Sequence, residues 1–149
     1  MDINLSYDNA TQAFDWVYEN GDFCTNTDDL ASAVQMSLFT WGHATDGWVN
    51  PDGSGNMYGN WIDSEYGFYV GSRIYQLWLE GITTDDATVA KTNDIVNQSL
   101  AWMLSQDVAS AISVNSNIVN NSQIEIDISI TKPTGQVSQY SYVWGSING

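Results

Sequence analysis

The sequence contains very little positive charge. Only Arg73, Lys91 and Lys132 stand against 18 acidic residues in a chain of 149, so the formal net charge is −15. A surface of this kind repels the phosphates of nucleic acids and of anionic membranes, and we expect neither as a partner. It favours a basic protein surface instead, although acidity can equally serve only to keep a chain in solution.

Cysteine, histidine and long apolar runs are scarce as well. Cys24 is the only cysteine, so no internal disulfide can form and cysteine usage gives no sign of an oxidising compartment. No stretch approaches the ~18 apolar residues of a membrane span. Met1 leads directly into polar, acidic sequence, so we expect no signal peptide. His43 is the only histidine, which excludes the usual zinc sites, and we expect it in a loop just beyond a helix.

Apolar and aromatic residues are plentiful by contrast. Hydrophobic residues make up 43% of the chain, with 7 Trp and 8 Tyr. A chain of this length and composition can bury a substantial core, and we expect one domain over residues 1–149.

Two kinds of periodicity predict the fold. Phe14, Trp16 and Tyr18 alternate before an Asn20-Gly21 turn, which predicts an N-terminal hairpin. Helical spacing then predicts three helices: one capped by Thr27 and ended by Gly42, one from about 70 to 79, and one capped by Thr83 or Thr84 and running to about 105. After that the period becomes two, which predicts a three-stranded antiparallel meander. The predicted class is α+β, with three helices packed on an antiparallel sheet.

Residues 42–67 form a predicted loop that is rich in glycine and in large aromatic side chains. Asn50, Asp52, Ser54 and Asn56 alternate like the oxygen ligands of a Ca²⁺ loop, but the glycine in register and the terminal glutamate are missing, so we expect no metal or other cofactor. Asp63 and Glu65 are spaced like a glycosidase carboxylate pair, which leaves a peptidoglycan hydrolase as the alternative function. A carbohydrate-binding module that uses the tryptophans is a third interpretation, although the lectin-like all-β pattern is missing.

Seven residues are the predicted partner-binding set. Arg73 lies near the start of the second predicted helix, where a cation is disfavoured by the helix dipole, so we expect a carboxylate such as Asp63 or Glu65 to hold it. Aromatic side chains dominate protein interfaces, and the edge strand of a meander can accept a strand from a neighbour. The set is Trp48, Trp61, Tyr66, Arg73, Tyr140, Tyr142 and Trp144.

Short motifs in a fixed order resemble a known family. They are Asp22-Phe23, Asp28 to Val34, Ser37-Leu38-Phe39-Thr40, Trp61-Ile62-Asp63, Gly71-Ser72-Arg73-Ile74-Tyr75-Gln76-Leu77, Ser99 to Met103, Asp107-Val108-Ala109, Lys132-Pro133-Thr134-Gly135 and Tyr142-Val143-Trp144. Each is weak alone, but in this order they resemble the Mu-type phage baseplate wedge family, which is related to the sheath-initiating wedge protein of contractile tails.

The resemblance implies a structural role without catalysis. It implies that the chain is made in the cytoplasm of a bacterial host and is incorporated, as one of several copies, into the six-fold baseplate of a virion tail. The implied partners are other baseplate wedge proteins and the sheath or tube proteins.

Overall fold

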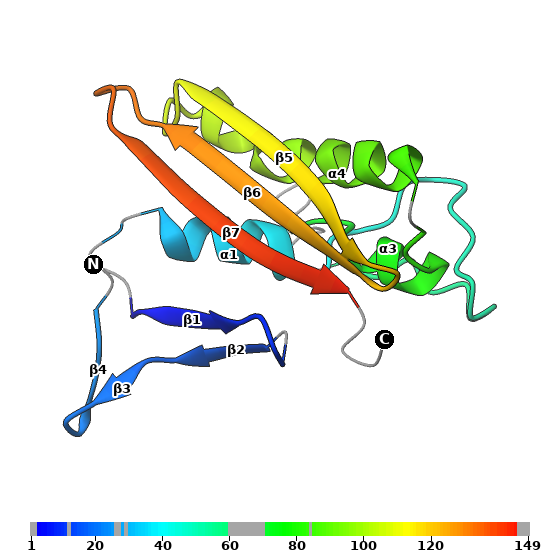
Figure 1. Ribbon diagram of the computed structural model, residues 1–149, viewed down its shortest axis with the longest axis horizontal. Coiled ribbons are helices and arrows are strands. Elements are labelled where there is room, and N and C mark those ends of the chain that lie inside the picture. The colour runs from blue at the N-terminus through cyan, green and yellow to red at the C-terminus, as the bar shows by residue number, and fades with distance from the viewer. Residues whose placement is uncertain are drawn as a thin grey trace.

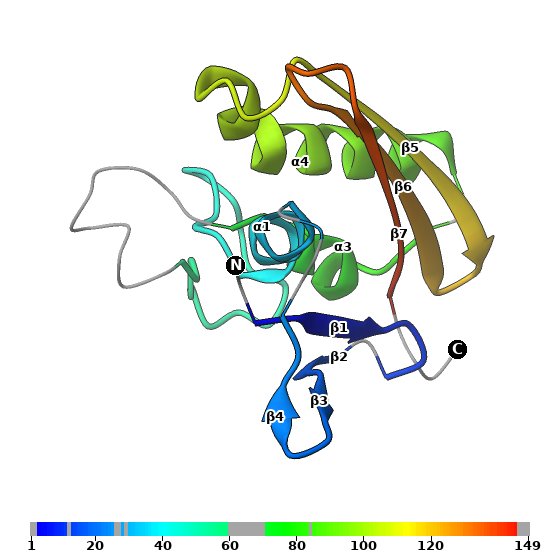
Figure 2. The same cartoon turned by 90° about the vertical axis from the view of Figure 1, so that its left-hand side faces the viewer.

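The computed structural model describes residues 3–11, 13–25, 28, 30–59, 71–83 and 85–145. A three-stranded sheet of β5 (Ala111–Asn120), β6 (Gln123–Thr131) and β7 (Val137–Gly145) has helices on one face (Figure 1). The helices are α1 (Ala31–Phe39), α3 (Tyr75–Glu80) and α4 (Asp86–Ser105). In the described part of the chain no helix covers the opposite face, as the end-on view makes clear (Figure 2). The predicted α+β class is therefore confirmed.

The central strand β6 supplies the core of the sheet. Its isoleucines at 124, 126, 128 and 130 are buried and alternate with half-buried polar residues. This alternation places one apolar row against the helices and one polar row on the open face. Both neighbours pair with β6 antiparallel, so that Ile126 lies between Ser116 and Tyr142. The predicted meander is confirmed over its full length.

Helix α4 packs its apolar stripe on this row of isoleucines. Ile95, Val96, Leu100 and Met103 are buried in the same core cluster as the β6 side chains. Its N-cap is Asp85, whose carboxylate accepts a hydrogen bond from the Thr88 amide at 2.8 Å. The predicted caps, Thr83 and Thr84, are therefore wrong by one or two residues. A carboxylate at this position is favoured by the helix dipole as well as by the hydrogen bond.

Helices α1 and α3 are shorter than the periodicity predicts. Leu30, not Thr27, is the N-cap of α1 and makes no side-chain cap bond; Thr27 itself is outside the described residues. The Asp28 carboxylate instead accepts the Leu30 amide at 3.1 Å and the Tyr140 hydroxyl at 2.7 Å, which fixes the chain before the helix starts. Helix α3 begins at Tyr75 rather than near residue 70, because residues 71 and 72 are held against the end of α1.

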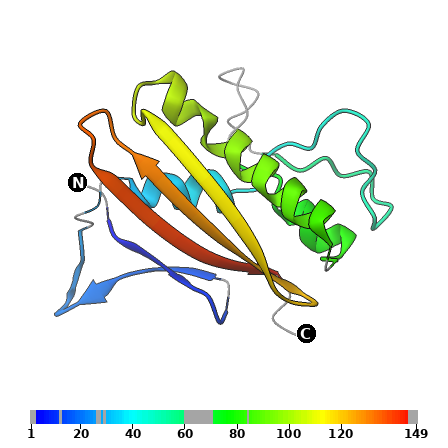
Figure 3. The same ribbon diagram turned by 45° about the horizontal axis from the view of Figure 1, so that its top comes forward.

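The N-terminal hairpin is a twisted two-stranded ribbon, residues 3–25. Strand β1 (Leu5–Asp8) pairs with β2 (Ala13–Trp16), and β3 (Tyr18–Glu19) pairs with β4 (Asp22–Phe23). Asn20 and Gly21 both have positive φ, which gives the tight turn that the sequence predicted. The β1–β2 end lies beside β7, and the β3–β4 end projects away from the body (Figures 1 and 3).

None of the helices in the described ranges combines the length and apolarity that crossing a bilayer requires.

Candidate interaction surfaces

The segment around Gly71 crosses the end of α1 at very short range. The Gly42 amide donates to the Ser72 carbonyl at 2.8 Å, and the Ser72 amide donates to the Thr40 carbonyl at 2.9 Å. A Cβ on Gly71 would lie 2.2 Å from the Thr40 carbonyl oxygen, and Gly71 has a φ of +92°. Only glycine satisfies both conditions, because it lacks a Cβ and adopts positive φ freely. We call this contact the 40–42/71–72 crossing.

Ser72 joins the two elements that meet at the crossing. Its hydroxyl donates to the Leu38 carbonyl near the end of α1 and accepts the amide of Ile74 at 3.2 Å. Both bonds are buried, and they satisfy backbone groups at a helix end that would otherwise lack partners. The Gly-Ser pair of the Gly-Ser-Arg motif therefore fixes where the next residue, Arg73, begins its side chain.

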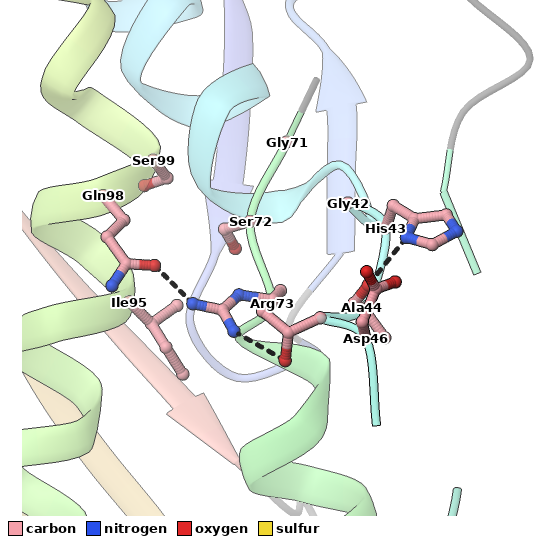
Figure 4. A pocket seen from close by; sticks show the side chains of 11 residues that line it. Gly42, His43, Ala44, Asp46, Gly71, Ser72, Arg73, Ile95, Gln98 and Ser99 are labelled. Atoms are coloured by element: carbon pink, nitrogen blue, oxygen red, sulfur yellow. Dashed lines mark hydrogen bonds between the residues drawn. The ribbon is translucent and has the colours of Figure 1, made fainter. Parts of the chain in front are cut away.

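Arg73 spans a pocket between this segment and α4. Its guanidinium donates to the Gln98 side-chain oxygen on α4 and, at 3.4 Å, to the Thr45 hydroxyl (Figure 4). The pocket has a volume of about 420 Å³ and is also lined by His43, Asp46 and Ser99. We call it the Arg73 pocket. Asp63 and Glu65, the predicted partners of Arg73, are outside the described residues.

His43 lies where the sequence suggested, in the loop that follows α1. Its Nδ1 is 2.6 Å from the Ala44 carbonyl oxygen, and its side chain lies at the rim of the Arg73 pocket. Within the described ranges no three His, Cys, Asp or Glu side chains gather into a group that could hold a metal ion. The pocket is lined by polar side chains, among them Gln98 and Ser99, and also by the apolar surface of Ala44 and Ile95.

An aromatic cluster holds the following loop against the body. Tyr75 is fully buried, and its ring is 5.2 Å from that of Trp41, 4.8 Å from that of Tyr58 and 6.1 Å from that of Trp48. The Trp48 indole also donates to the Glu80 carboxylate at 2.9 Å. Trp48 is half-buried, so one part of it anchors the loop and the rest faces solvent.

The alternating polar residues of this loop serve its backbone. Asn50, Asp52, Ser54 and Asn56 each accept, through a side-chain oxygen, the backbone amide two residues further along, at 2.7 to 3.2 Å. These are successive Asx and Ser turns. The hydrogen bonds from Ser54 hold the pKa of the Asp52 carboxyl below its ordinary value. The spacing that resembles a Ca²⁺ loop thus has a structural explanation.

The aromatic residues of β7 point toward the helices. Tyr142 is only 5% exposed and belongs to the core cluster. The Tyr140 hydroxyl is bound to Asp28, and the Trp144 indole donates to the Ile74 carbonyl at 3.2 Å. Burial is the main reason why the pKa of the Tyr142 hydroxyl is raised to about 12. These rings therefore hold β7 to the body, and the strand offers its backbone and its polar face to the outside.

One point on the free side of β7 is occupied by the ribbon. The Asn9 side chain accepts the Val143 amide at 3.0 Å, and the Tyr7 hydroxyl donates to the Val143 carbonyl at 3.0 Å. Alternate residues of an edge strand direct their amides and carbonyls to the same side, so Ser141 and Gln139 face outward like Val143. Within the described ranges, the backbones of Ser141 and Gln139 have no hydrogen-bond partner on that side.

The open face of the sheet is polar. A shallow groove of about 340 Å³ runs over it and is lined mainly by Ser, Asn, Gln and Asp side chains: Ser113, Asn115, Asp127, Ser129, Gln139 and Ser141. Such a face carries many side-chain hydrogen-bonding groups.

Part of the predicted partner-binding set can be placed and part cannot. Trp48 lies in the loop that begins at Gly42, and Arg73 lines the pocket beside the start of that loop, while the three β7 aromatics lie together at the core. Trp61 and Tyr66 are outside the described residues. Ser72 and Tyr75 were not among the predicted residues, and their only signal in the sequence was their place in the motif from Gly71 to Leu77.

Comparison with known proteins identifies a family. Residues 30–137 match the family described as Phage protein GP46. The chain is 32% identical over 133 residues to the protein named Baseplate protein gp46 of Escherichia phage Mu, and the alignment covers 85% of this chain and 90% of that protein. The matched family region extends from the N-cap of α1 to the first residue of β7 and includes the Arg73 pocket.

Proposed function

The chain belongs to the Phage protein GP46 family, and from this membership we propose that it is a structural subunit of a phage tail baseplate. The similarity to a protein named for the baseplate over 85% of the chain supports this role. In this proposal the chain is located in the baseplate of the virion tail and works by binding other baseplate proteins, without catalysis.

The finer assignment is a wedge component of a contractile tail. The ordered motifs of the sequence support it, and one of them, Gly-Ser-Arg, contributes directly to the architecture at the 40–42/71–72 crossing. Several copies would then surround the tail axis, each in contact with other wedge proteins and with the sheath or tube. The whole chain would act as a single unit.

The observation that carries the binding mode is the free edge of β7. The outward amides and carbonyls of Gln139 and Ser141 are available to pair with an extended segment of a neighbour, as in strand addition to other sheet edges. The buried aromatics keep β7 rigid, so little conformational entropy is lost when a strand is added. Side-chain selectivity would come from the polar groove beside this edge, through Asn115, Asp127 and Gln139.

The Arg73 pocket is the second proposed contact. A guanidinium has five N–H donors, and the described bonds to Thr45 and Gln98 leave donors over. A carboxylate of a partner protein fits such a position, because arginine binds carboxylates in a bidentate manner. In this proposal Trp48, Trp61 and Tyr66 contribute aromatic contacts to the partner.

The binding mode is tested by one substitution at the β7 edge. Ser141→Pro removes an outward amide but not a β6–β7 hydrogen bond, and proline is tolerated on edge strands when its nitrogen faces outward. Phage lacking the gene would be complemented with each variant, and the chain in purified tails would be quantified. We expect Ser141→Pro to be depleted from tails while its melting temperature stays near that of the wild type.

Ser141→Ala is the matched control, because it removes the same hydroxyl and keeps the amide. It should enter tails at the wild-type level. Equal incorporation of the proline and alanine variants would refute strand addition at this edge. Absence of the wild-type chain from purified tails would refute the baseplate role itself.

A further inference from the structure

We infer that the projecting end of the N-terminal ribbon is a separate docking surface, which binds a positively charged, partly apolar surface on another protein of the tail. The inference rests on the proposed function, since it assumes that such a neighbour exists. The ribbon precedes the region matched by the family, residues 30–137. It is distinct from the β7 edge and from the Arg73 pocket.

The two faces of the ribbon differ in chemistry. Strand register places Leu5 opposite Trp16, Tyr7 opposite Phe14, and Tyr18 opposite Phe23. Side chains of directly paired residues, and of every second residue along a strand, lie on one face. One face of the ribbon is therefore a row of aromatic rings from Tyr7 to Phe23.

The inner end of this aromatic row is used within the molecule. The Tyr7 ring is stacked on that of Phe39 in α1 at 4.6 Å, and Phe14 lies 5.2 Å from the same ring. Tyr7 also contacts the Tyr142 ring of β7 at 5.6 Å. These contacts anchor the ribbon to both the helical layer and the sheet.

The outer end of the row is exposed. Trp16 is 58% exposed, Tyr18 60% and Phe23 43%. Figure 2 shows β3 and β4 extending away from the helices and the sheet. Large aromatic side chains in a contiguous exposed group indicate an interaction surface, and Trp and Tyr are the residues most enriched at interface hot spots.

The exposed rings are already arranged for binding. The Phe23 ring makes edge-to-face contacts with Trp16 and with Tyr18, each with centroids 5.3 Å apart. The Tyr18 hydroxyl donates to the Gly21 carbonyl at 2.8 Å, which fixes its ring across the turn. A surface that is ordered before binding loses less conformational entropy when a partner arrives.

The acidic residues of the ribbon determine the charge of the partner. Asp15, Glu19 and Asp22 lie on the face opposite the rings, and Glu19 is directly paired with Asp22 across the strands. Like charges in such a pair repel each other, and residues 3–25 contain no lysine or arginine to offset them. A cationic partner would relieve this repulsion. A second copy of the chain, also at −15, would increase it.

The first test measures incorporation into tails by the complementation assay. Trp16→Ser combined with Tyr18→Ser should lower the amount of chain per tail by about tenfold or more, as expected for loss of two hot-spot rings. Asp15→Asn combined with Asp22→Asn should also lower it, because the charge attraction is reduced. Asn can still accept the amide bonds that Asp15 and Asp22 make to Trp16 and Phe23.

The matched control is Asp94→Asn combined with Asp107→Asn. All four carboxylates are exposed, and both pairs change the net charge from −15 by two units. Incorporation of the control pair should equal that of the wild type. If the two pairs behave alike, or if the Trp16 and Tyr18 variant enters tails normally, the inference is overturned while the proposed function stands.

The second test does not depend on whether those variants fold. A photo-crosslinking benzoylphenylalanine at position 18 of the otherwise unchanged chain should join, in intact tails, a different protein at a segment where Lys and Arg outnumber Asp and Glu. The same group at position 14 should crosslink within the chain, since Phe14 lies against Phe39. Position 18 joined only to its own chain, to a second copy, or to an acidic segment would overturn the inference.

Discussion

Replacement of Gly71 by alanine tests whether the crossing of the two segments fixes the position of Arg73. Two independent effects act on the variant. The φ of +92° is unfavourable for any residue with a Cβ, and the added Cβ would lie 2.2 Å from the Thr40 carbonyl oxygen and 2.8 Å from its carbonyl carbon. Because both atoms belong to the backbone, the contact cannot be relieved by a side-chain rotation.

Gly47 separates the two effects. Its φ is +85°, close to that of Gly71, but a Cβ there meets nothing within 4 Å. Gly47→Ala should therefore cost only the backbone term, about 1–2 kcal/mol. Gly71→Ala should cost this plus the steric term of an overpacked site, about 1–3 kcal/mol more. For a domain of this size the additional loss lowers the melting temperature by roughly 3–9 °C relative to Gly47→Ala.

The assay is thermal and urea denaturation of the two variants and the wild type, followed by tryptophan fluorescence. Trp41 stacks on Tyr75 beside the crossing, so its emission contributes to the signal. If Gly71→Ala is no less stable than Gly47→Ala, the two segments are not in close contact and the structural role assigned to the Gly-Ser-Arg motif is incorrect.

Three further perturbations address other parts of the molecule. Asp85→Ala should lower the melting temperature by a few degrees, whereas Asp85→Asn should keep most of the stability. Because the hydrogen bond from the Thr88 amide lowers the pKa of the Asp85 carboxyl, this stabilisation should also be lost as the pH falls through that lowered pKa, and an unchanged dependence of stability on acid pH would contradict this. Asn50 is 2% exposed, and Asn50→Ala should cost about 1–3 kcal/mol and speed amide exchange over residues 50–58, whereas Asn97→Ala on the surface of α4 should do neither. Burial raises the pKa of Tyr142 to about 12, so the free energy of unfolding should fall between pH 10 and 12, where the tyrosine ionises in the unfolded chain and not in the folded one. Tyr142→Phe should reduce this dependence on pH, and an equal dependence in both proteins would contradict the burial of the Tyr142 hydroxyl.

The sheet could be predicted in detail because one of its faces is buried. Alternation at 124, 126, 128 and 130 is the direct result of a strand with one dry and one wet side, and it fixes register as well as type. The Asn20-Gly21 turn is predictable for a similar reason, since few residues adopt positive φ readily. In both cases the signal lies within a few neighbouring residues.

The predicted helix boundaries were wrong where a residue far away in the sequence determines them. The predicted cap at Thr27 would put Asp28 in the first turn of α1, yet Asp28 is held before the helix by Tyr140, 112 positions away. Likewise the start of α3 depends on the crossing of residue 72 with the end of α1. Local propensity contains no information about such contacts.

Some residues of the candidate site could be predicted from the sequence, but their positions and contacts could not. Arg73 was predicted as a binding residue because cations are rare in this chain, but its described partners, Thr45 and Gln98, come from two other segments. Tyr140, Tyr142 and Trp144 were selected from strand alternation, which shows that the three share a face. It does not show which face, and the helices on that side make it the inner one.

The two hydrogen bonds that Asn9 and Tyr7 make to the Val143 backbone affect whether unassembled subunits can associate with one another. Proteins that display a bare strand edge tend to pair with copies of themselves, and they avoid this by interrupting the edge. Here two side chains close the edge at Val143 while Ser141 and Gln139 remain accessible. Two free chains therefore cannot align whole edges and polymerise before they meet their proper neighbour. A strand of a neighbour that pairs with β7 must end before Val143. The same two side chains would therefore limit its length and fix its register.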